Sequence, residues 1–452
     1  MIRSTATLLL SALTVLALVP FAYSEYTVSQ LTENSYDDRL PLINADGDVV
    51  WSGNGGSGTD FEVFLYDGSS ITQLTDNSYD DTAYGINDNG YVVWYGWDGT
   101  DFEIFLYNGS STDQVTDNSY DDIGYGMDVI PHAINSNGYI VWQGCDGGSS
   151  GSCEGGDWEI FLYDGSAITQ LTDNSYDDDY PQINENGHVA WQGCAGGGDC
   201  PATYIGDGWE IFLYDGSTTV RLTDNASYDG HPQISANGDV VWQGWDGADN
   251  EIFLYNGSTT EPLTDNSSND IDPQINAAGH VVWVGDREIF LYDGSATTQL
   301  TDNTYEDNNP QIGDSGHVVW HGRGGTEELD MEIFLYDGRT TTRITNNLHH
   351  YDAYPRTNAN GDVVWFGAAF TWPDLIWEDF EIYLARPSGP PVTDWAAAST
   401  AGAESPSASA TVNCLFFLII SVSTVLLWKG WRRPKKESCR FGCPRGKRVG
   451  PS

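Results

Sequence analysis

The chain has 452 residues, of which 66 are Asp or Glu and 18 are Lys or Arg, and its formal net charge is −48. All of its lysines lie beyond residue 428, and residues 25–411 contain only eight basic residues, all arginines. Such an acidic chain repels nucleic acid phosphates, so a nucleic-acid partner is not expected, whereas cations or basic partners are attracted. A purely solubilising coat is the alternative interpretation of the charge.

The N-terminus has the pattern of a secretory signal peptide, residues 1–24. Arg3 precedes an apolar run over 8–19, and Ala22 and Ser24 place small residues before a cleavage point that follows Ser24. This order of a basic residue, an apolar stretch and small residues is typical of segments removed on export. An uncleaved anchor is the alternative.

Most of the remaining chain, residues 25–386, consists of eight copies of one repeat. In the copy over 171–216, a Leu-Thr-Asp-Asn opening is followed by Pro-Gln-Ile-Asn, by Asn-Gly-His-Val-Ala-Trp and by Glu-Ile-Phe-Leu-Tyr-Asp-Gly. Repeats of this length indicate solenoids, propellers or arrays. The tryptophan of the repeat recurs in eight places: Trp51, Trp94, Trp142, Trp191, Trp242, Trp283, Trp320 and Trp365.

Each copy contains four short runs rich in Val, Ile, Thr, Phe, Tyr and Trp, separated by Asn-Gly, Asp-Gly and similar turns. Such dipeptides between strand-like runs mark tight hairpins, and four antiparallel strands form one propeller blade. The sequence therefore predicts an all-β fold, a single eight-bladed β-propeller of four-stranded antiparallel blades. The repeated tryptophans are expected to form the core between blades.

The two ends of the array predict how the ring closes. Tyr26–Thr32 matches the Thr-rich last strand of a blade, whereas the array ends on Glu381–Leu384, which matches the third strand. The N-terminal strand is therefore expected to complete the last blade, which hides an open sheet edge. Pro262 lies in the same Thr-rich strand, and proline belongs on an edge strand.

These repeats resemble the TolB-type family of propeller repeats, relatives of WD-like propellers. The resemblance rests on the Leu-Thr-Asp opening, the Pro-x-Ile-Asn and Asn-Gly-x-Val-x-Trp hairpin, and the Glu-Ile-Phe-Leu-Tyr-Asp-Gly close, over residues 26–384. It implies a propeller fold and does not determine a function. The chain departs from TolB itself, which is understood to have six blades and an additional N-terminal domain.

The C-terminal part predicts a membrane anchor. Residues 387–411 are rich in Pro, Ser, Ala, Thr and Gly, as in a flexible stalk. Residues 412–428 form an apolar run, and about 20 such residues can cross a bilayer as a transmembrane helix. The tail over 429–452 is basic, which places it in the cytoplasm. We expect a single-pass membrane protein whose propeller lies outside the cytoplasm, at the cell surface or in the periplasm; a buried helix or a sorting tail cut by a transpeptidase are the alternatives.

Four cysteines are candidates for disulfides. Cys145 and Cys153 follow one repeat tryptophan, and Cys194 and Cys200 follow the next, each pair within a Gly-rich segment. An oxidising location outside the cytoplasm favours two local bonds, Cys145–Cys153 and Cys194–Cys200. A four-thiolate metal site is the alternative.

Candidate ligand-binding residues lie mainly in two kinds of loop, those from the last strand to the next blade and those between the second and third strands. Both emerge on one side of a propeller, and recognition often uses long loops on a rigid scaffold. Arg356 is a separate candidate, because other repeats carry Gln182 or Gln233 at its position. The aromatic candidates in or next to these loops are Tyr79, Trp97, Tyr120, Trp158, Tyr176, Trp209 and Trp245.

Calcium is the metal that the acidic loops would suit, because it takes six to eight oxygen ligands. The predicted ligands are Asp80, Asp81, Asp98 and Asp101. In the alternative interpretation these side chains only cap turns, as Asp and Asn commonly do. No other cofactor is expected.

The sequence thus favours a membrane-anchored binding or scaffold propeller for a protein or polysaccharide, and not an enzyme. Two alternatives are a polysaccharide-processing enzyme similar to propeller lyases and a structural surface-layer component. The lyase interpretation would require charged residues that break the repeat pattern near the axis, and Arg356 is the residue that fits this requirement best.

Overall fold

The computed structural model describes residues 26–55, 60–123, 133–147, 153, 156–195, 208–225, 227–324, 330–371 and 376–388. These residues form β-strands and turns, with no helix among them, in agreement with the predicted all-β class. The predicted signal peptide, membrane span and basic tail lie outside the described residues, as does the stalk except for its first two residues. In the described part of the chain, no helix has the length and apolar character needed to cross a membrane. The chain divides into two units, 1–400 and 401–452, and every described residue belongs to the first.

The strands form groups of four, and in all of these groups except the last the chain order equals the order across the sheet. The first strands are β2 (Asp38–Ile43), β6 (Asp81–Ile86), β10 (Asp122–Ile123), β14 (Asp178–Ile183), β18 (Asp229–Ile234), β22 (Asp270–Ile275), β26 (Asp307–Ile312) and β30 (His350–Thr357). The second strands are β3 (Val49–Asn54), β7 (Val92–Trp97), β11 (Ile140–Cys145), β15 (Val189–Cys194), β19 (Val240–Trp245), β23 (Val281–Gly285), β27 (Val318–Arg323) and β31 (Val363–Thr371).

The third strands carry the Glu-Ile-Phe-Leu-Tyr motif, and the fourth are the short Thr-rich ones. The third strands are β4 (Phe61–Tyr66), β8 (Phe102–Tyr107), β12 (Trp158–Tyr163), β16 (Trp209–Tyr214), β20 (Asn250–Tyr255), β24 (Glu288–Tyr292), β28 (Met331–Tyr336) and β33 (Glu381–Pro387). The fourth strands are β5 (Ile71–Gln73), β9 (Thr112–Gln114), β13 (Ile168–Gln170), β17 (Thr219–Arg221), β21 (Thr260–Pro262), β25 (Thr297–Gln299), β29 (Thr341–Arg343) and, at the N-terminus, β1 (Tyr26–Gln30).

Six of these groups are separate four-stranded sheets, and the last two join in one nine-stranded sheet. The junction is a single parallel pairing of Met331 in β28 with Tyr351 in β30. The ninth strand is the short β32 (Ile376–Trp377), which pairs with β31. Such repeated antiparallel sheets of four strands are those of a β-propeller.

The N-terminal strand pairs with the C-terminal strand of the array. β1 is antiparallel to β33, with Tyr26 opposite Pro387 and Gln30 opposite Tyr383. The predicted pairing of Tyr26–Thr32 with Glu381–Leu384 is therefore present. A backbone hydrogen bond of 2.7 Å from the Leu31 N–H to the Ile382 carbonyl extends it by one residue.

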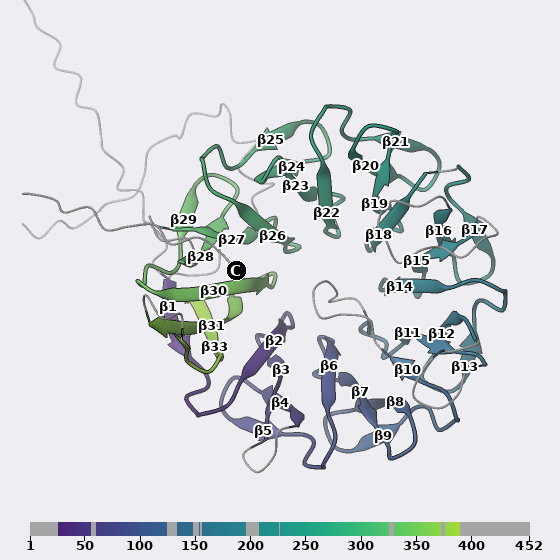
Figure 1. The fold of residues 1–452 in the computed structure, drawn as a ribbon, viewed down its shortest axis with the longest axis horizontal. Helices are drawn as coiled ribbons and strands as arrows, with labels where there is room; N and C mark the ends of the chain where they lie inside the picture. The colour runs from purple at the N-terminus through teal and green to yellow at the C-terminus, as the bar shows by residue number, and fades with distance from the viewer. Residues whose placement is uncertain are drawn as a thin grey trace, which may run out of the picture. The chain divides into compact units, whose positions relative to one another are not determined.

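Burial follows the position of a strand within its sheet. The second strands are almost wholly buried, whereas the side chains of the fourth strands are mostly exposed. Each first strand packs against the second strand of the preceding group or, for the short β10, against its third strand, and β2 packs in the same way against β31 of the last group. Figure 1 shows the first strands turned toward a common centre, with the fourth strands at the periphery. The second strands are thus covered on both faces, which explains the three consecutive apolar residues with which each begins.

The repeated tryptophans form the expected core. Each is at most 1% exposed and stacks on the aromatic ring of the neighbouring third strand, as Trp51 does on Phe64 with ring centroids 5.7 Å apart. A buried indole N–H needs an acceptor, and an aspartate at the start of the first strand provides it. The Nε1 to Oδ1 hydrogen bonds that the structure shows are Trp51–Asp38, Trp142–Asp122, Trp191–Asp178, Trp242–Asp229, Trp283–Asp270, Trp320–Asp307 and Trp365–Asp352.

Candidate functional site

Strand register assigns every connection to one of two ends of the sheets. In β6 and β7, Asp81 lies opposite Gly96, so the loop that precedes β6 and the loop that follows β7 are at one end, the loop end. Ile86 lies opposite Val92, so the Asn-Gly turn between them is at the other end, the turn end. The predicted common location of the two longer kinds of loop is therefore confirmed.

At the turn end, asparagine side chains join neighbouring sheets. The asparagine that ends the Pro-x-Ile-Asn motif donates its Nδ2–H to a backbone carbonyl of the next sheet, and these bonds are buried. The bonds run from Asn44 to Asn87, Asn87 to Asn135, Asn135 to Asn184, Asn184 to Ser235, Asn276 to Gly313 and Asn358 to Asn44, at 2.9 to 3.1 Å. We call this set the amide belt. Ser235 and Gly313 occupy the asparagine position in the other two sheets.

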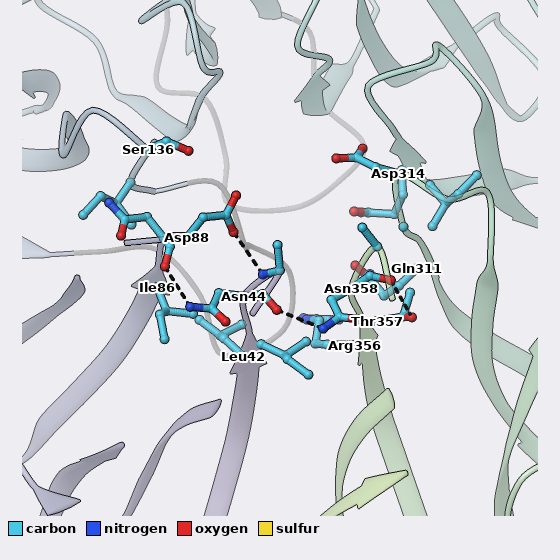
Figure 2. Close-up of a pocket in the computed structure, with 18 of the residues that line it drawn as sticks. Leu42, Asn44, Ile86, Asp88, Ser136, Gln311, Asp314, Arg356, Thr357 and Asn358 are labelled. Atoms are coloured by element: carbon cyan, nitrogen blue, oxygen red, sulfur yellow. Dashed lines mark hydrogen bonds between the residues drawn. The ribbon is translucent and has the colours of Figure 1, made fainter. Parts of the chain in front are cut away.

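A pocket of about 210 Å³ lies within the amide belt, where the first strands end. Its wall combines apolar side chains such as Leu42, Ile86 and Ile312 with amides of the belt. Figure 2 shows Asp88 and Asp314 on opposite sides of this opening. We refer to it as the turn-end pocket. Its mixture of aliphatic wall and polar rim is suited to a ligand that makes hydrogen bonds at a few positions.

Three carboxylates mark the rim of the turn-end pocket. One Asp88 oxygen accepts the Ala45 N–H at 2.9 Å, and one Asp314 oxygen accepts the Ala277 N–H at 3.0 Å. Glu185 accepts the Ser136 N–H in the same way, at 3.1 Å. All three are exposed. Each side chain is therefore oriented by the neighbouring sheet while it remains accessible to a ligand.

Arg356 forms part of the same wall. It lies near the turn end of β30 and is 8% exposed. Its Nη1 is 3.4 Å from the Pro355 carbonyl. The corresponding positions of β22 and β26 carry Gln274 and Gln311, which also line the pocket. The guanidinium of Arg356 thus replaces a neutral glutamine amide at one place in the pocket wall.

The other predicted ligand-binding residues lie at the loop end, so the structure does not bring the set together. Trp97 and Trp245 are the last residues of second strands, and Trp158 and Trp209 are the first residues of third strands. In each sheet these two positions lie opposite each other. All four tryptophans are half-buried. Tyr79, Tyr120 and Tyr176 occupy the loops before the first strands, and Tyr79 is 43% exposed.

The four predicted calcium ligands are also divided. Asp98 and Asp101 lie together, and Glu103 joins them, with one ligand oxygen from each within 4.8 Å of the others. Asp80 instead accepts the Phe61 N–H at 2.8 Å, and Asp81 binds the side chain of Asn77. Among the described residues, the group of possible metal ligands thus includes Asp98 and Asp101 of the four predicted aspartates.

The pKa values of Asp98, Asp101 and Glu103 are shifted in different directions. Burial raises the pKa of Glu103 to about 7, and it also raises the pKa of Asp101. Hydrogen bonds from the Thr100 side chain lower the pKa of Asp98, which is exposed. The group therefore pairs an accessible, readily ionised carboxylate with two that are costly to ionise without a cation nearby.

The predicted disulfide between Cys145 and Cys153 is present, with Cα atoms 5.5 Å apart. Cys194 is also disulfide-bonded. Its predicted partner, Cys200, lies outside the described residues. Cys145 and Cys194 both end a second strand, so each bond begins at the base of a loop-end connection.

Sequence reasoning missed three features of these sites: the amide belt, the acidic rim and Glu103. The belt asparagines and Glu103 belong to motifs that recur in the repeats. Their repetition indicated a structural role and did not mark them as binding residues. Asp88, Glu185 and Asp314 share one turn position, which Ala45 and Ser136 occupy elsewhere. Comparison of the copies at this position would have singled out the three acids.

Comparisons with known proteins support the fold. No protein-family model matches the chain, and no curated protein matches it. Among solved structures it is similar to dipeptidyl peptidase 4 of Porphyromonas gingivalis, at 10% identity and a TM-score of 0.51, over 73% of this chain and 57% of that enzyme. An acylaminoacyl peptidase of Pyrococcus horikoshii matches at 11% identity and a TM-score of 0.48, over 75% and 58% of the two chains.

The propeller domain of the Trilobed protease from Pyrococcus furiosus matches at 10% identity and a TM-score of 0.46, over 69% of this chain and 96% of that one. The chain therefore spans less than two thirds of the two peptidases and nearly all of the isolated propeller domain. At such low identity the likeness shows a propeller fold and does not carry an activity across. The finer resemblance to TolB-type repeats is not tested by these matches.

Proposed function

We propose that this chain is a binding module that holds a basic segment of a protein partner at the turn-end pocket. The observation that carries the proposal is the rim formed by Asp88, Glu185 and Asp314, which are positioned by neighbouring sheets and exposed. Lysine or arginine side chains of a partner would pair with these carboxylates by charge-assisted hydrogen bonds.

The charge of the whole chain favours the same partner. A net charge of −48 raises the local concentration of a cationic ligand and speeds its association. Arg356 gives the pocket a donor for a backbone carbonyl or carboxylate of the bound segment. The aliphatic wall would contact the stems of the basic side chains.

The test uses the purified full-length chain on an array of Lys/Arg-rich, Asp/Glu-rich and neutral peptides, beside a glycan array. We expect binding to the basic peptides, weakened as salt rises from about 0.05 to about 0.5 M, because screening shortens the range of charge attraction. The triple variant Asp88→Asn, Glu185→Gln, Asp314→Asn should lose this binding.

The matched control is the triple variant Asp76→Asn, Asp173→Asn, Asp302→Asn, which makes the same change in net charge at exposed positions of the loop end. It should bind as the unmodified chain does. Equal losses in the two triple variants would show that net charge and not the pocket binds the peptides. Binding to glycans alone would favour the polysaccharide alternative.

The proposal includes a closed ring of eight blades. It is supported by the pairing of β1 with β33, by the packing of β2 on β31, and by the hydrogen bond from Asn358 to the Asn44 carbonyl at 3.0 Å. A closed ring would hold the three rim carboxylates at constant separations. It would also give the module the rigidity that a preorganised binding site needs.

Export and membrane anchoring complete the proposal, with the propeller outside the cytoplasm, at the cell surface or in the periplasm. The support is in the sequence: the signal-peptide pattern over 1–24 and the apolar run over 412–428 followed by basic residues. Cell fractionation tests it. The full chain should stay with membranes after alkaline extraction, and a chain truncated before residue 412 should be released.

A non-enzymatic role is part of the same proposal. The described polar side chains that line the pocket are amides, hydroxyls, carboxylates and the guanidinium of Arg356. These groups suit hydrogen bonding to a ligand. A polysaccharide lyase activity that Arg356→Gln abolished would contradict the proposal.

A further inference from the structure

We propose that two equivalent loops at the loop end bind calcium ions, one through Asp98, Asp101 and Glu103 and the other through Asp246, Asp249 and Glu251. In each group, one ligand oxygen from each of the three side chains lies within 4.8 Å of the others. These sites are separate from the turn-end pocket, and failure of either proposal leaves the other standing.

The two loops have the same local structure because they share the sequence Asp-Gly-x-Asp-x-Glu. In each, the N–H of the first aspartate bonds to the carbonyl of the second at 3.1 Å. Gly99 and Gly247 adopt φ of 114° and 109° in the turn, a region that other residues rarely occupy. The tight turn brings the first aspartate close to the second and to the glutamate, which is the second residue of the third strand.

A buried carboxylate oxygen without a hydrogen-bond partner points to a ligand in both loops. Asp101 is wholly buried and its Oδ2 has no partner; Asp249 is 8% exposed and its Oδ1 has none. An ionised carboxylate that is buried in this way is costly unless it is paired with a cation or coordinates a metal. A cation bound at these two oxygens would offset the cost of burying the carboxylates.

Two other repeats show that the glutamate of this site accepts a cation. Arg221 Nη2 lies 2.9 Å from Glu210 Oε1, and Arg343 pairs with Glu332 in the same manner. The residues that correspond to these arginines are Gln114 beside Glu103 and Pro262 beside Glu251. The repeats that hold the three-carboxylate groups therefore lack the internal guanidinium at that position.

Calcium fits this donor set better than other common metals. The groups offer carboxylate oxygens only, which hard cations prefer, and calcium tolerates the irregular, six- to eight-fold coordination that a short loop provides. Further carboxylates lie close by, Asp117 and Asp121 near Asp101 and Asp265 near Asp249.

The test uses terbium as a luminescent substitute for calcium, with the full-length chain freed of metal and held at about 0.15 M salt. Trp97 and Trp245 immediately precede the two loops, so excitation of tryptophan should sensitise terbium emission at both. Calcium should displace the terbium. Asp101→Asn and Asp249→Asn should each remove about half of the emission, and the double variant should remove nearly all of it.

Stability provides a second measurement that does not depend on luminescence. Calcium should raise the melting temperature of the unmodified chain, and this rise should be absent in the double variant. Without calcium the double variant should melt no lower than the unmodified chain, because asparagine removes a buried unpaired charge. Asp302→Asn, at the position of Asp117 and Asp265 in a repeat without the loop sequence, should change neither result. Sensitised emission that persists in the double variant, or an unmodified chain with neither emission nor a calcium-dependent rise, would overturn the proposal.

Discussion

Asn358 donates a hydrogen bond of 3.0 Å from its Nδ2 to the carbonyl of Asn44, across 314 residues of sequence. The same side chain accepts the N–H groups of Asn360 and Asp362 through its Oδ1, both at 3.0 Å. One amide thus shapes a turn of the last sheet and ties it to the first.

The first prediction concerns this amide. Asn358→Ala should lower the free energy of unfolding by about 2–4 kcal/mol, because it removes a buried hydrogen bond and leaves its partners unsatisfied. Urea unfolding measures the change. Asn360→Ala is the control, because the Asn360 side chain is exposed and its bond to the Ala45 carbonyl is open to water. Equal effects of the two substitutions would contradict the importance of the buried bond.

The second prediction concerns the junction of the chain ends. Leu31→Pro removes the N–H that bonds to the Ile382 carbonyl, so it should lower the melting temperature by several degrees. Gln30→Pro should be tolerated, because Gln30 of β1 occupies the position that Pro262 occupies in β21. Gln30 lies opposite Tyr383, and Pro262 lies opposite Phe253. If both proline variants melted like the unmodified chain, the pairing of β1 with β33 would contribute nothing to stability.

The third prediction is a decrease of stability as pH rises from about 5 to about 8. Burial raises the pKa of Asp81 and Asp178 to about 7, well above the value of 3.8 that applies to an exposed aspartate. The folded state therefore holds protons that the unfolded state releases in this range, and this contribution is lost as the pH rises through the folded pKa. Thermal melts in the presence of a chelator, at several pH values, measure it.

The control for the pH prediction is a single substitution. Asp178→Asn cannot ionise, so the stability of this variant should depend less steeply on pH than that of the unmodified chain. Asp302→Asn, at an exposed position, should keep the full dependence. A chain whose stability increases from pH 5 to pH 8 would refute the prediction.

The fourth prediction concerns the disulfide between Cys145 and Cys153. The cysteines are eight residues apart, so replacing both with serine should cost about 2–3 kcal/mol of unfolding free energy in the chain-entropy model. Non-reducing peptide mapping should recover this pair and the pair Cys194–Cys200. Mapping that finds the four thiols free, or paired crosswise, would contradict the assignment.

Much of the fold follows from local sequence. The strands of each repeat were predictable because short runs rich in Val, Ile, Phe and Trp are separated by turns such as Asn-Gly and Asp-Gly, which restrict the backbone locally. The outer position of the Thr-rich strand followed from the two ends of the array, and Pro262 agrees with it, since proline cannot donate a ladder hydrogen bond. The disulfide at Cys145 was predictable because its partner is close along the chain.

The sites were less predictable because their residues meet across sheets. Arg356 was a candidate because it replaces a repeated glutamine, but only the strand register shows that it lies at the turn end while Trp97 lies at the loop end. Asp80 was expected beside Asp98, but its hydrogen bond to Phe61 holds it against the preceding sheet. A sequence lists these residues without the separations that packing gives them.

The sequence by itself determined the repeat, the four strands of each copy and the turns between them, because these depend on the residue types of short segments and on the backbone preferences of neighbouring residues. Only the tertiary structure decided which side chains of neighbouring sheets meet. The Asn44 carbonyl accepts a hydrogen bond from Asn358, and the Asp88 carboxylate accepts one from the Ala45 N–H. Both bonds form because neighbouring sheets pack face to face with their turns side by side. The packing of buried tryptophans and valines between the sheets sets this alignment. Residues far apart in the chain contribute to that packing.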